Sequence, residues 1–199
     1  MNPWRARLNR WRRRLVQRLL YRIVFGERSQ GEWRPYTRVS PATCIDHDEH
    51  LALGDHVYIG PFNFIEASGG ITIDEGVQIT THCTLVTHSS HRAMRLLGRD
   101  FVHWPAGHER PGWVSGPIHI GAYSFIGPHS LIEAGSVLGR GTIVCAGCHV
   151  RGEFPDFAVL EGRPARIVGD SRRRDLPYLQ DHPSLHPAYM AWAGEDERT

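Results

Sequence analysis

Lysine is absent from this chain of 199 residues, in which all 23 permanently cationic side chains are Arg. Chemistry that needs a lysine amine, such as Schiff-base formation, is therefore excluded. Long apolar runs are missing too, since none reaches the roughly 18 residues of a membrane span. The many Arg residues inside the first apolar stretch argue against a signal peptide. No P-loop or Rossmann glycine motif occurs, which disfavours ATP or NAD as a bound cosubstrate.

Cysteine is scarce, with four residues and no disulfide-dense spacing. This usage favours a reducing compartment, and the expected location is the cytoplasm. Cys145 and Cys148 have the spacing of half a zinc knuckle, but no second pair exists to complete four ligands. No metal is therefore expected.

An aliphatic residue recurs every six positions in successive runs. The first run is Leu53, Ile59 and Ile65, the second is Ile73, Ile79 and Leu85, and after an interruption come Ile120, Ile126, Ile132, Leu138, Val144 and Val150. A glycine follows directly at Gly54, Gly60, Gly121, Gly127 and Gly139. A period of six fits neither the 3.6-residue rhythm of a helix nor the alternation of one long strand. Each hexapeptide is therefore predicted to be a short strand plus a turn, with three of them closing a triangular coil that stacks on the next.

This pattern resembles the left-handed parallel β-helix of the hexapeptide-repeat acyltransferases over about residues 35–169. The resemblance implies an all-β solenoid, and the left-handed winding comes from the resemblance alone. A β-sandwich and a right-handed solenoid remain alternatives. The length fits one domain with terminal additions. We expect a basic helical segment at 1–28, the β-helix at 35–169 with a loop insertion at 88–117, and a tail at 170–199 that contains a short helix.

Residues 4–25 are predicted to form an amphipathic helix, with an apolar face made of Trp4, Leu8, Trp11, Leu15, Leu19 and Ile23. Residues 1–28 hold nine Arg against one acid, a net charge of about +8, whereas the remainder balances 14 Arg against 20 acids at about −6. The helix is expected either to pack on the β-prism or to lie on an anionic membrane at the inner face, and both roles are compatible. Nucleic acid is not an expected partner, because the predicted prism is acidic and has no helix or strand suited to contacting bases.

The repeat breaks at about Thr87, where the segment from Thr87 to Arg95 resembles the active-site segment of galactoside and maltose O-acetyltransferases. The resemblance implies that His88 is the catalytic base and that Arg95 lies beside the substrate. A neutral imidazole can take the proton of a hydroxyl as that oxygen attacks a thioester. His91 is a substrate contact in this interpretation and the main alternative base.

The repeat register places Glu66 and Glu133 on either side of Val86, two residues before His88. Either carboxylate could hold the second imidazole nitrogen and stabilise the imidazolium. Glu66 is the preferred candidate, and the alternative is that it is only a solvated turn residue.

Residues 159–168 resemble the Gly-x-Pro-Ala-Arg/Lys segment that closes these acetyltransferases. The resemblance implies acetyl-CoA as the acyl donor and a homotrimer whose clefts lie between subunits. It also implies that Ala146 lies beside the pantetheine arm and that Arg151, Arg163 and Arg166 are near the nucleotide, where guanidinium groups suit phosphate oxygens.

Two positions depart from the galactoside acetyltransferase pattern. The substrate-facing side-chain amide is replaced by Gly60, and the backbone amide beside the thioester falls at Pro128, which has no N–H. The oxyanion donor is therefore unassigned. The polysaccharide-modifying branch is the closer resemblance, through Tyr58 and the residues that follow it. In the loop, Trp104 and Trp113 are predicted to stack on a sugar ring, and the alternative is that the loop packs on a neighbouring subunit.

The sequence therefore predicts an acetyl-CoA-dependent O-acetyltransferase that acts on a sugar hydroxyl of a surface polysaccharide, lipopolysaccharide or lipid-linked precursor. An amino-sugar N-acetyltransferase or an antibiotic acetyltransferase would use the same fold and base. A γ-type carbonic anhydrase, with three His around zinc, and a non-catalytic membrane scaffold are the remaining alternatives.

Overall fold

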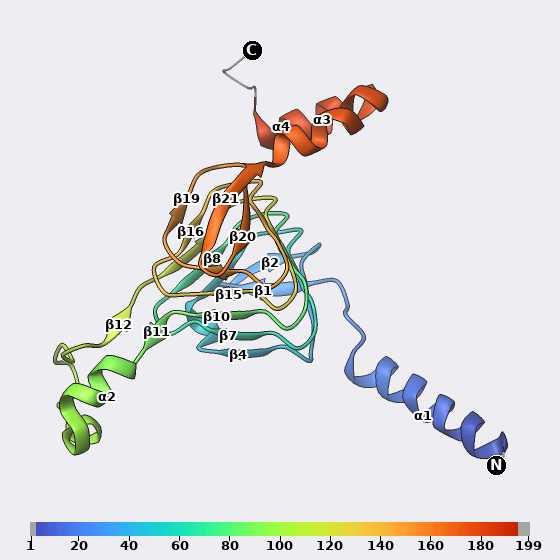
Figure 1. The fold of residues 1–199 in the computed structure, drawn as a ribbon. Helices are drawn as coiled ribbons and strands as arrows, with labels where there is room; N and C mark the ends of the chain where they lie inside the picture. Colours follow the sequence, from blue (N-terminus) through green and yellow to red (C-terminus); the bar gives the residue numbers. More distant parts are fainter. Residues whose placement is uncertain (1–2, 195–199) are drawn as a thin grey trace.

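The computed structural model describes residues 3–194, in which the chain visits three sheets in turn (Figure 1). Sheet 1 contains β3 (Arg38–Val39), β6 (Tyr58–Ile59), β9 (Gln78–Ile79), β14 (Phe125–Ile126), β17 (Ile143–Val144), β20 (Ala158–Gly162) and β21 (Ala165–Asp170). Sheet 2 contains β4 (Cys44–Asp46), β7 (Phe64–Glu66), β10 (Thr84–Val86), β15 (Leu131–Ile132) and β18 (His149–Val150). Sheet 3 contains β5 (Leu51–Leu53), β8 (Ile71–Ile73), β13 (Ile118–Ile120), β16 (Val137–Leu138) and β19 (Glu153–Phe154).

The strands of these sheets pair in parallel, one coil on the next, and only the terminal pair β20–β21 is antiparallel. The parallel sheets that the resemblance implied are confirmed, and apart from β20–β21 these three sheets contain no antiparallel pair of the β-sandwich kind within residues 3–194. In sheet 2, Ile65 lies opposite Leu85, which lies opposite Ile132. All three side chains are fully buried. The aliphatic residue of each hexapeptide therefore stacks on its equivalent in the next coil and forms the core.

Where a glycine follows the aliphatic residue, it is required by the close approach of the next coil. A Cβ added at Gly54, Gly60, Gly121, Gly127 or Gly139 would lie closer than 3.0 Å to backbone atoms of a neighbouring coil. At Gly60 the obstructing atom is the carbonyl oxygen of Thr80. Coils separated by one strand spacing leave no room for a side chain at this turn position.

Helix α1 (Pro3–Leu20) precedes a hairpin of β1 (Glu27–Ser29) and β2 (Glu32–Arg34). The predicted helix over 4–25 was too long at its C-terminal end. Tyr21 donates the last helical hydrogen bond, to Gln17, and its ring then contacts Phe62 at 5.6 Å between centroids. The contact of Tyr21 with Phe62 draws the chain towards the first coils at the point where the helix ends. Within residues 3–194, no helix is long and apolar enough to cross a lipid bilayer.

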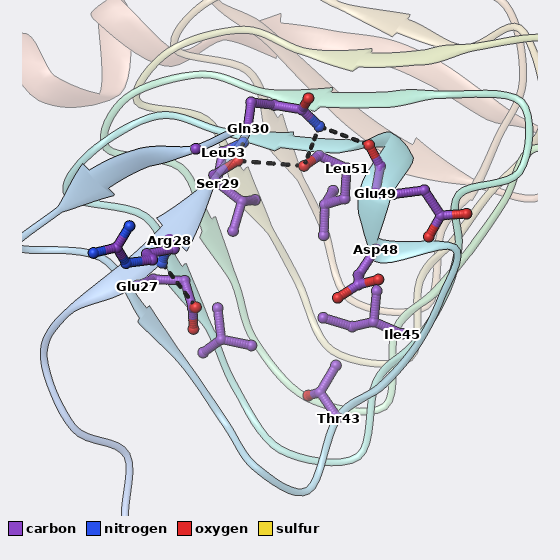
Figure 2. A pocket seen from close by; sticks show the side chains of 12 residues that line it. Glu27, Arg28, Ser29, Gln30, Thr43, Ile45, Asp48, Glu49, Leu51 and Leu53 are labelled. Atoms are coloured by element: carbon purple, nitrogen blue, oxygen red, sulfur yellow. Dashed lines mark hydrogen bonds between the residues drawn. The ribbon is translucent and has the colours of Figure 1, made fainter.

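The first coil runs from β3 through β4 and a 3₁₀ turn, η1 (Asp48–His50), to β5, where the hairpin β1–β2 covers part of its open end. The Ser29 hydroxyl accepts a hydrogen bond from the amide of Leu53 at 2.7 Å, which ties the hairpin to the coil. A cavity of about 730 Å³ remains at this end, with aliphatic side chains at its floor and charged groups at its rim (Figure 2). None of the predicted site residues lines this cavity.

The segment after β21 has more structure than the single short helix that the sequence predicts. It forms α3 (Ser171–Asp181), a 3₁₀ turn, η3 (Pro183–Leu185), and α4 (His186–Ala193). The Asp170 side chain caps α3 by accepting a hydrogen bond from the amide of Arg172. Trp192 of α4 stacks on Tyr123 and contacts Phe157, with centroids 4.7 and 5.9 Å apart. These aromatic contacts hold the helices on the last coils, and the hexapeptide pattern does not predict them.

The predicted loop insertion leaves the coils after β10 and returns before β13. Its stem is a short antiparallel pair, β11 (His88–Ser89) with β12 (Val114–Ser115). Between these strands lie α2 (His91–Leu97) and a 3₁₀ segment, η2 (Gly98–His103). The stack continues beneath the loop without interruption, because β10 pairs directly with β15 of the next coil. In Figure 1 the loop and α1 leave the coils on opposite sides.

Candidate active site

His88 is the first residue of the loop stem, at the corner where sheet 2 turns towards sheet 3. We call this the His88 corner. The Nδ1 atom of His88 lies 2.8 Å from Oε2 of Glu66, which ends β7 one coil below. The register that pairs Val86 with Glu66 brings the two side chains together, as the sequence predicts. Ser68 Oγ lies 3.1 Å from the same imidazole nitrogen.

Glu66 is a carboxylate with 7% exposure that is surrounded by hydrogen-bond donors. Its Oε1 accepts from the amide of Ser68 at 2.9 Å, and its Oε2 accepts from the amide and hydroxyl of Thr87 at 3.1 and 2.8 Å. Burial alone would raise the pKa of Glu66, but the bonds from Ser68 and Thr87 outweigh it and lower the pKa to about 2. Glu66 is therefore ionised at neutral pH, and Nδ1 of His88 is assigned as the protonated nitrogen that donates to it.

Trp113 lies against the face of the His88 imidazole. The ring centroids are 4.8 Å apart and the ring planes differ by 10°. One imidazole nitrogen bonds Glu66 and one ring face stacks on Trp113, so the orientation of His88 is restricted by two independent contacts. The indole therefore has a role that the sequence did not predict, because Trp113 was expected to stack on a sugar ring.

A cavity of about 390 Å³ opens beside His88 and is lined by Val86, His88, Ser89, His91, Arg92, Val114, Glu133, Ala134 and Arg151. Two guanidinium groups and three side chains able to bind protons meet in this small space. Glu133 does not contact His88. Its Oε1 lies 2.9 Å from His149 Nε2, and its Oε2 lies 3.8 Å from Arg151 Nε. Of the two candidate carboxylates, only Glu66 holds the imidazole.

His91 starts α2 and lines this cavity, and its Nδ1 lies 2.7 Å from the hydroxyl of Ser89. Arg95 does not line the cavity, whereas Arg92, one turn earlier on α2, does. Arg95 is exposed on α2, and its contact with a substrate stays a prediction.

Tyr58 also lies away from His88, because β6 belongs to sheet 1 while His88 follows sheet 2. The guanidinium of Arg38 lies 5.0 Å from the centroid of the Tyr58 ring. The predicted contact of Tyr58 with a substrate at the His88 corner is not supported within one chain.

Trp104 and Trp113 line a second cavity, of about 480 Å³, inside the loop. Arg110 is part of the same lining, and its guanidinium lies 5.2 Å from the centroid of the Trp113 ring. The Nε1 atom of Trp104 is buried and has no hydrogen-bond partner among residues 3–194. Trp113 thus contacts His88 and also lines this loop cavity, where the N–H group of Trp104 has no hydrogen-bond acceptor among the described residues.

The predicted donor-site residues form a second group, at the corner where sheet 1 turns towards sheet 2. Ala146 is exposed there, directly after β17. Arg163 lies at the end of β20, and its Nε donates a hydrogen bond to the carbonyl of Gly147. Arg166 follows on β21, opposite Glu161 in the ladder, and is exposed. We call this the Arg163 corner. Arg151 is not part of it, because Arg151 lines the cavity at the His88 corner.

Sequence reasoning missed Thr87, Ser68 and Arg92. Thr87 is fully buried, and its hydroxyl donates to Glu66 while accepting from the amide of Gly69. The sequence signal for Thr87 was its position: it directly follows Val86, and Val86 lies opposite Glu66 in the predicted register. Asn63 is buried, with its amide nitrogen bonded to the carbonyl of Gly60, so it cannot replace the substrate-facing amide that this chain lacks.

Metal-ligating side chains gather elsewhere. Among residues 3–194, the only group of three or more His, Cys, Asp or Glu residues with ligand atoms within 4.8 Å of one another is His47, Glu49 and His50, exposed on the first coil. His103 and His108, which suggested a γ-type carbonic anhydrase, do not belong to it.

Comparison with known proteins gives no matching family model, but it does give related sequences. A probable acetyltransferase of Mycobacterium tuberculosis is 29% identical over 126 residues, which is 63% of this chain and 39% of that protein. Staphylococcus aureus proteins named as acetyltransferases are 29% identical over 62% of this chain and 56% of their own length. The galactoside O-acetyltransferase of Escherichia coli is 27% identical over 80% of this chain and 70% of that enzyme. The chain thus spans about half the length of the first two relatives.

A solved hexapeptide-repeat acetyltransferase from Vibrio cholerae aligns with a TM-score of 0.57 at 22% identity, over 80% of each chain. The resemblance to the hexapeptide-repeat acyltransferases is confirmed. An N-acyltransferase from Bacillus cereus, solved with dTDP and coenzyme A, shares this hexapeptide-repeat fold with a TM-score of 0.54 at 19% identity, over 74% of this chain and 87% of that one. These two likenesses concern the fold, and the roles of the residues at the His88 and Arg163 corners rest on the geometry given above.

Proposed function

We propose that this protein transfers an acetyl group from acetyl-CoA to a hydroxyl of a sugar, with His88 as the general base. The observation that carries the proposal is the His88–Glu66 pair, which lies beside a cavity at the mouth of the inserted loop. The acceptor class we favour is a surface polysaccharide, a lipopolysaccharide or a lipid-linked precursor. The relationship to a galactoside O-acetyltransferase supports a hydroxyl acceptor.

The direction of the His88–Glu66 hydrogen bond gives His88 its chemical role. With the Nδ1 proton donated to Glu66, Nε2 has a free lone pair that can take the proton of an acceptor hydroxyl. The hydroxyl oxygen then forms a bond to the thioester carbonyl carbon, the carbon–sulfur bond breaks, and the proton passes from the imidazolium to the departing thiolate. The ionised Glu66 stabilises the imidazolium during this step. No covalent acyl-enzyme is needed.

The donor is proposed to lie along the Arg163 corner. Arg163 and Arg166 are exposed there beside Ala146, and their guanidinium groups suit the phosphates of coenzyme A. Arg151 lines the cavity at the His88 corner, so we assign it to the reacting end of the donor or to the acceptor. The coenzyme A bound to the B. cereus N-acyltransferase supports this choice of donor.

The His88 corner and the Arg163 corner are different corners of one chain, separated by sheet 2. A homotrimer would bring the His88 corner of one subunit against the Arg163 corner of its neighbour, so that one cleft uses both groups. We therefore propose a homotrimer of left-handed β-helices, which agrees with the family resemblance.

The test is release of free thiol from acetyl-CoA in the presence of candidate acceptors. The panel contains neutral sugars, a lipopolysaccharide core, a lipid-linked sugar and an amino sugar. We expect thiol release only with a hydroxyl acceptor, and we expect the His88→Ala variant to lose about 100- to 10,000-fold in kcat. Full turnover by that variant would contradict the assignment of the base. Release with the amino sugar alone would identify an N-acetyltransferase instead.

A further inference from the structure

Helix α1 leaves its apolar side chains exposed, which is unusual for an amphipathic helix. Every residue from Pro3 to Leu20 is exposed, and in Figure 1 the helix extends away from the coils. Trp4, Trp11 and Leu19 have exposures of 54, 59 and 70%. An amphipathic helix of a globular domain normally buries such a stripe against the core.

The apolar stripe does not face the coils. The helical period places Trp4, Leu8, Trp11, Leu15 and Leu19 on one side of α1. A cavity of about 700 Å³ lies between the helix and the first coils, and its lining comes from a different side of α1, namely Asn9, Arg12, Arg13, Val16 and Gln17, together with Tyr21, Ile23, Tyr58, Pro61 and Phe62. No residue of the stripe lines that cavity. The stripe is therefore free for another surface.

The charges of α1 indicate what that surface is. The helix contains seven Arg and no acidic residue. Arg7, Arg14 and Arg18 follow one flank of the stripe, and Arg5 and Arg12 follow the other. Tryptophan prefers the headgroup region of a bilayer, and rows of Arg beside an apolar stripe match the phosphates of anionic lipids. A second α1 would carry the same charge and repel the first.

We propose that α1 binds flat on the surface of an anionic lipid bilayer, with the Trp4–Leu19 stripe at the headgroup boundary and the Arg rows on lipid phosphates. The binding is peripheral, because α1 is too polar to cross the membrane. This inference does not rest on the proposed acetyltransferase activity, since vesicle binding is measured without a substrate.

The first experiment is flotation of the whole protein with phosphatidylcholine vesicles, with and without phosphatidylglycerol. Binding is expected only to the anionic vesicles and should weaken with salt. The variant Arg7→Gln/Arg14→Gln/Arg18→Gln should lower the partition coefficient by about 10- to 100-fold. A matched control with the same loss of charge, Arg99→Gln/Arg173→Gln/Arg174→Gln, should bind as the wild type. Equal loss in both variants would overturn the proposal, because only net charge would matter.

The second experiment uses vesicles whose acyl chains carry bromine, which quenches nearby indoles. Fluorescence should fall on binding, and the fall should be lost in Trp4→Phe/Trp11→Phe while flotation persists. Quenching that persists in this variant would place other residues at the membrane and overturn the proposal. So would dissociation of the oligomer when Trp4 and Trp11 are changed to Ala, since the stripe would then contact a second copy. Tighter binding to RNA than to anionic vesicles, independent of the two Trp residues, would identify a nucleic-acid partner instead.

Discussion

At the residue scale, the central feature is a charge that is buried and yet kept ionised. Glu66 accepts hydrogen bonds from Ser68, Thr87 and His88, so its desolvation is offset by four donors. Such a carboxylate has one orientation, and it fixes the orientation of the imidazole as well. Trp113 adds a second constraint from the ring face.

The first residue-scale prediction concerns the two carboxylates near His88. Glu66→Gln should lower kcat by about 10- to 100-fold, because a neutral amide no longer stabilises the imidazolium that forms during the reaction. Glu133→Gln is the matched control, since Glu133 lines the same cavity but contacts His149 and Arg151. Its kcat should stay within about twofold of the wild type. Equal effects of the two variants would remove Glu66 from its proposed role.

The second residue-scale prediction concerns stability and pH. The pKa of Glu66 falls from 4.5 to about 2 on folding. Because the folded pKa is lower, ionised Glu66 stabilises the fold above pH 4.5, and this contribution is lost as the pH falls from 4.5 to about 2. Urea denaturation of the wild type and Glu66→Gln should show a difference in the free energy of unfolding that shrinks over this interval. A difference that is independent of pH would contradict the prediction.

The partnership of Glu66 with His88 could be predicted because it depends only on register. The stacking of Trp113 on His88 could not, since it depends on how the loop folds over the corner. The place of Arg92 in the cavity lining has the same cause, because the helical path of α2 decides which guanidinium lines the cavity. Side-chain direction in irregular segments is not encoded in a six-residue period.

At the element scale, the short strands owe their position to stacking. A strand of two or three residues has too few ladder hydrogen bonds to be stable by itself. An inner strand such as β9 is held between the coils on either side, with its aliphatic side chain in the core. The repeat therefore predicted the strands well, and it predicted the helices poorly. Helix α1 ends at Leu20 and the C-terminal segment forms α3 and α4 because of aromatic contacts with the coils.

The element-scale prediction compares neighbours on β9. Ile79 is fully buried in the stack, whereas Gln78 is exposed on the same strand. Ile79→Ala should lower the free energy of unfolding by about 2–5 kcal/mol, and Gln78→Ala by less than about 1 kcal/mol. Urea denaturation followed by circular dichroism measures both. Similar losses would mean that stability does not reside in the aliphatic layers.

At the scale of the whole molecule, the two candidate groups of site residues are separated. His88 and Arg163 follow different sheets, and within residues 3–194 no cavity described above joins them. Both groups were proposed from the sequence, but the way in which they come together depends on the arrangement of subunits, which the sequence does not give directly. The distribution of charge is also a property of the whole, since α1 is basic and the rest of the chain is acidic.

The prediction at this scale is complementation between two inactive variants. His88→Ala and Arg163→Ala/Arg166→Ala should each be poor enzymes, the second through a raised KM for acetyl-CoA. After unfolding and refolding together, mixed oligomers should regain part of the wild-type turnover, because some clefts combine an intact His88 with an intact Arg163 from a neighbour. Light scattering should give the mass of three chains. Mixtures that stay inactive at that mass would mean that each site belongs to one chain.

The antiparallel stem at His88 and Ser115 makes the inserted segment a detachable module. Because β10 pairs directly with β15, the chain leaves and re-enters the stack at almost the same point. The packing of the core is therefore independent of the length of the inserted loop. Exchanging residues 90–112 for another sequence, with Trp113 kept against His88, should therefore leave folding intact while changing which acceptor reaches the imidazole. Selection acting on such a lineage could diversify its substrates by replacing one surface excursion, while the proton acceptor at the root of that excursion stays in place.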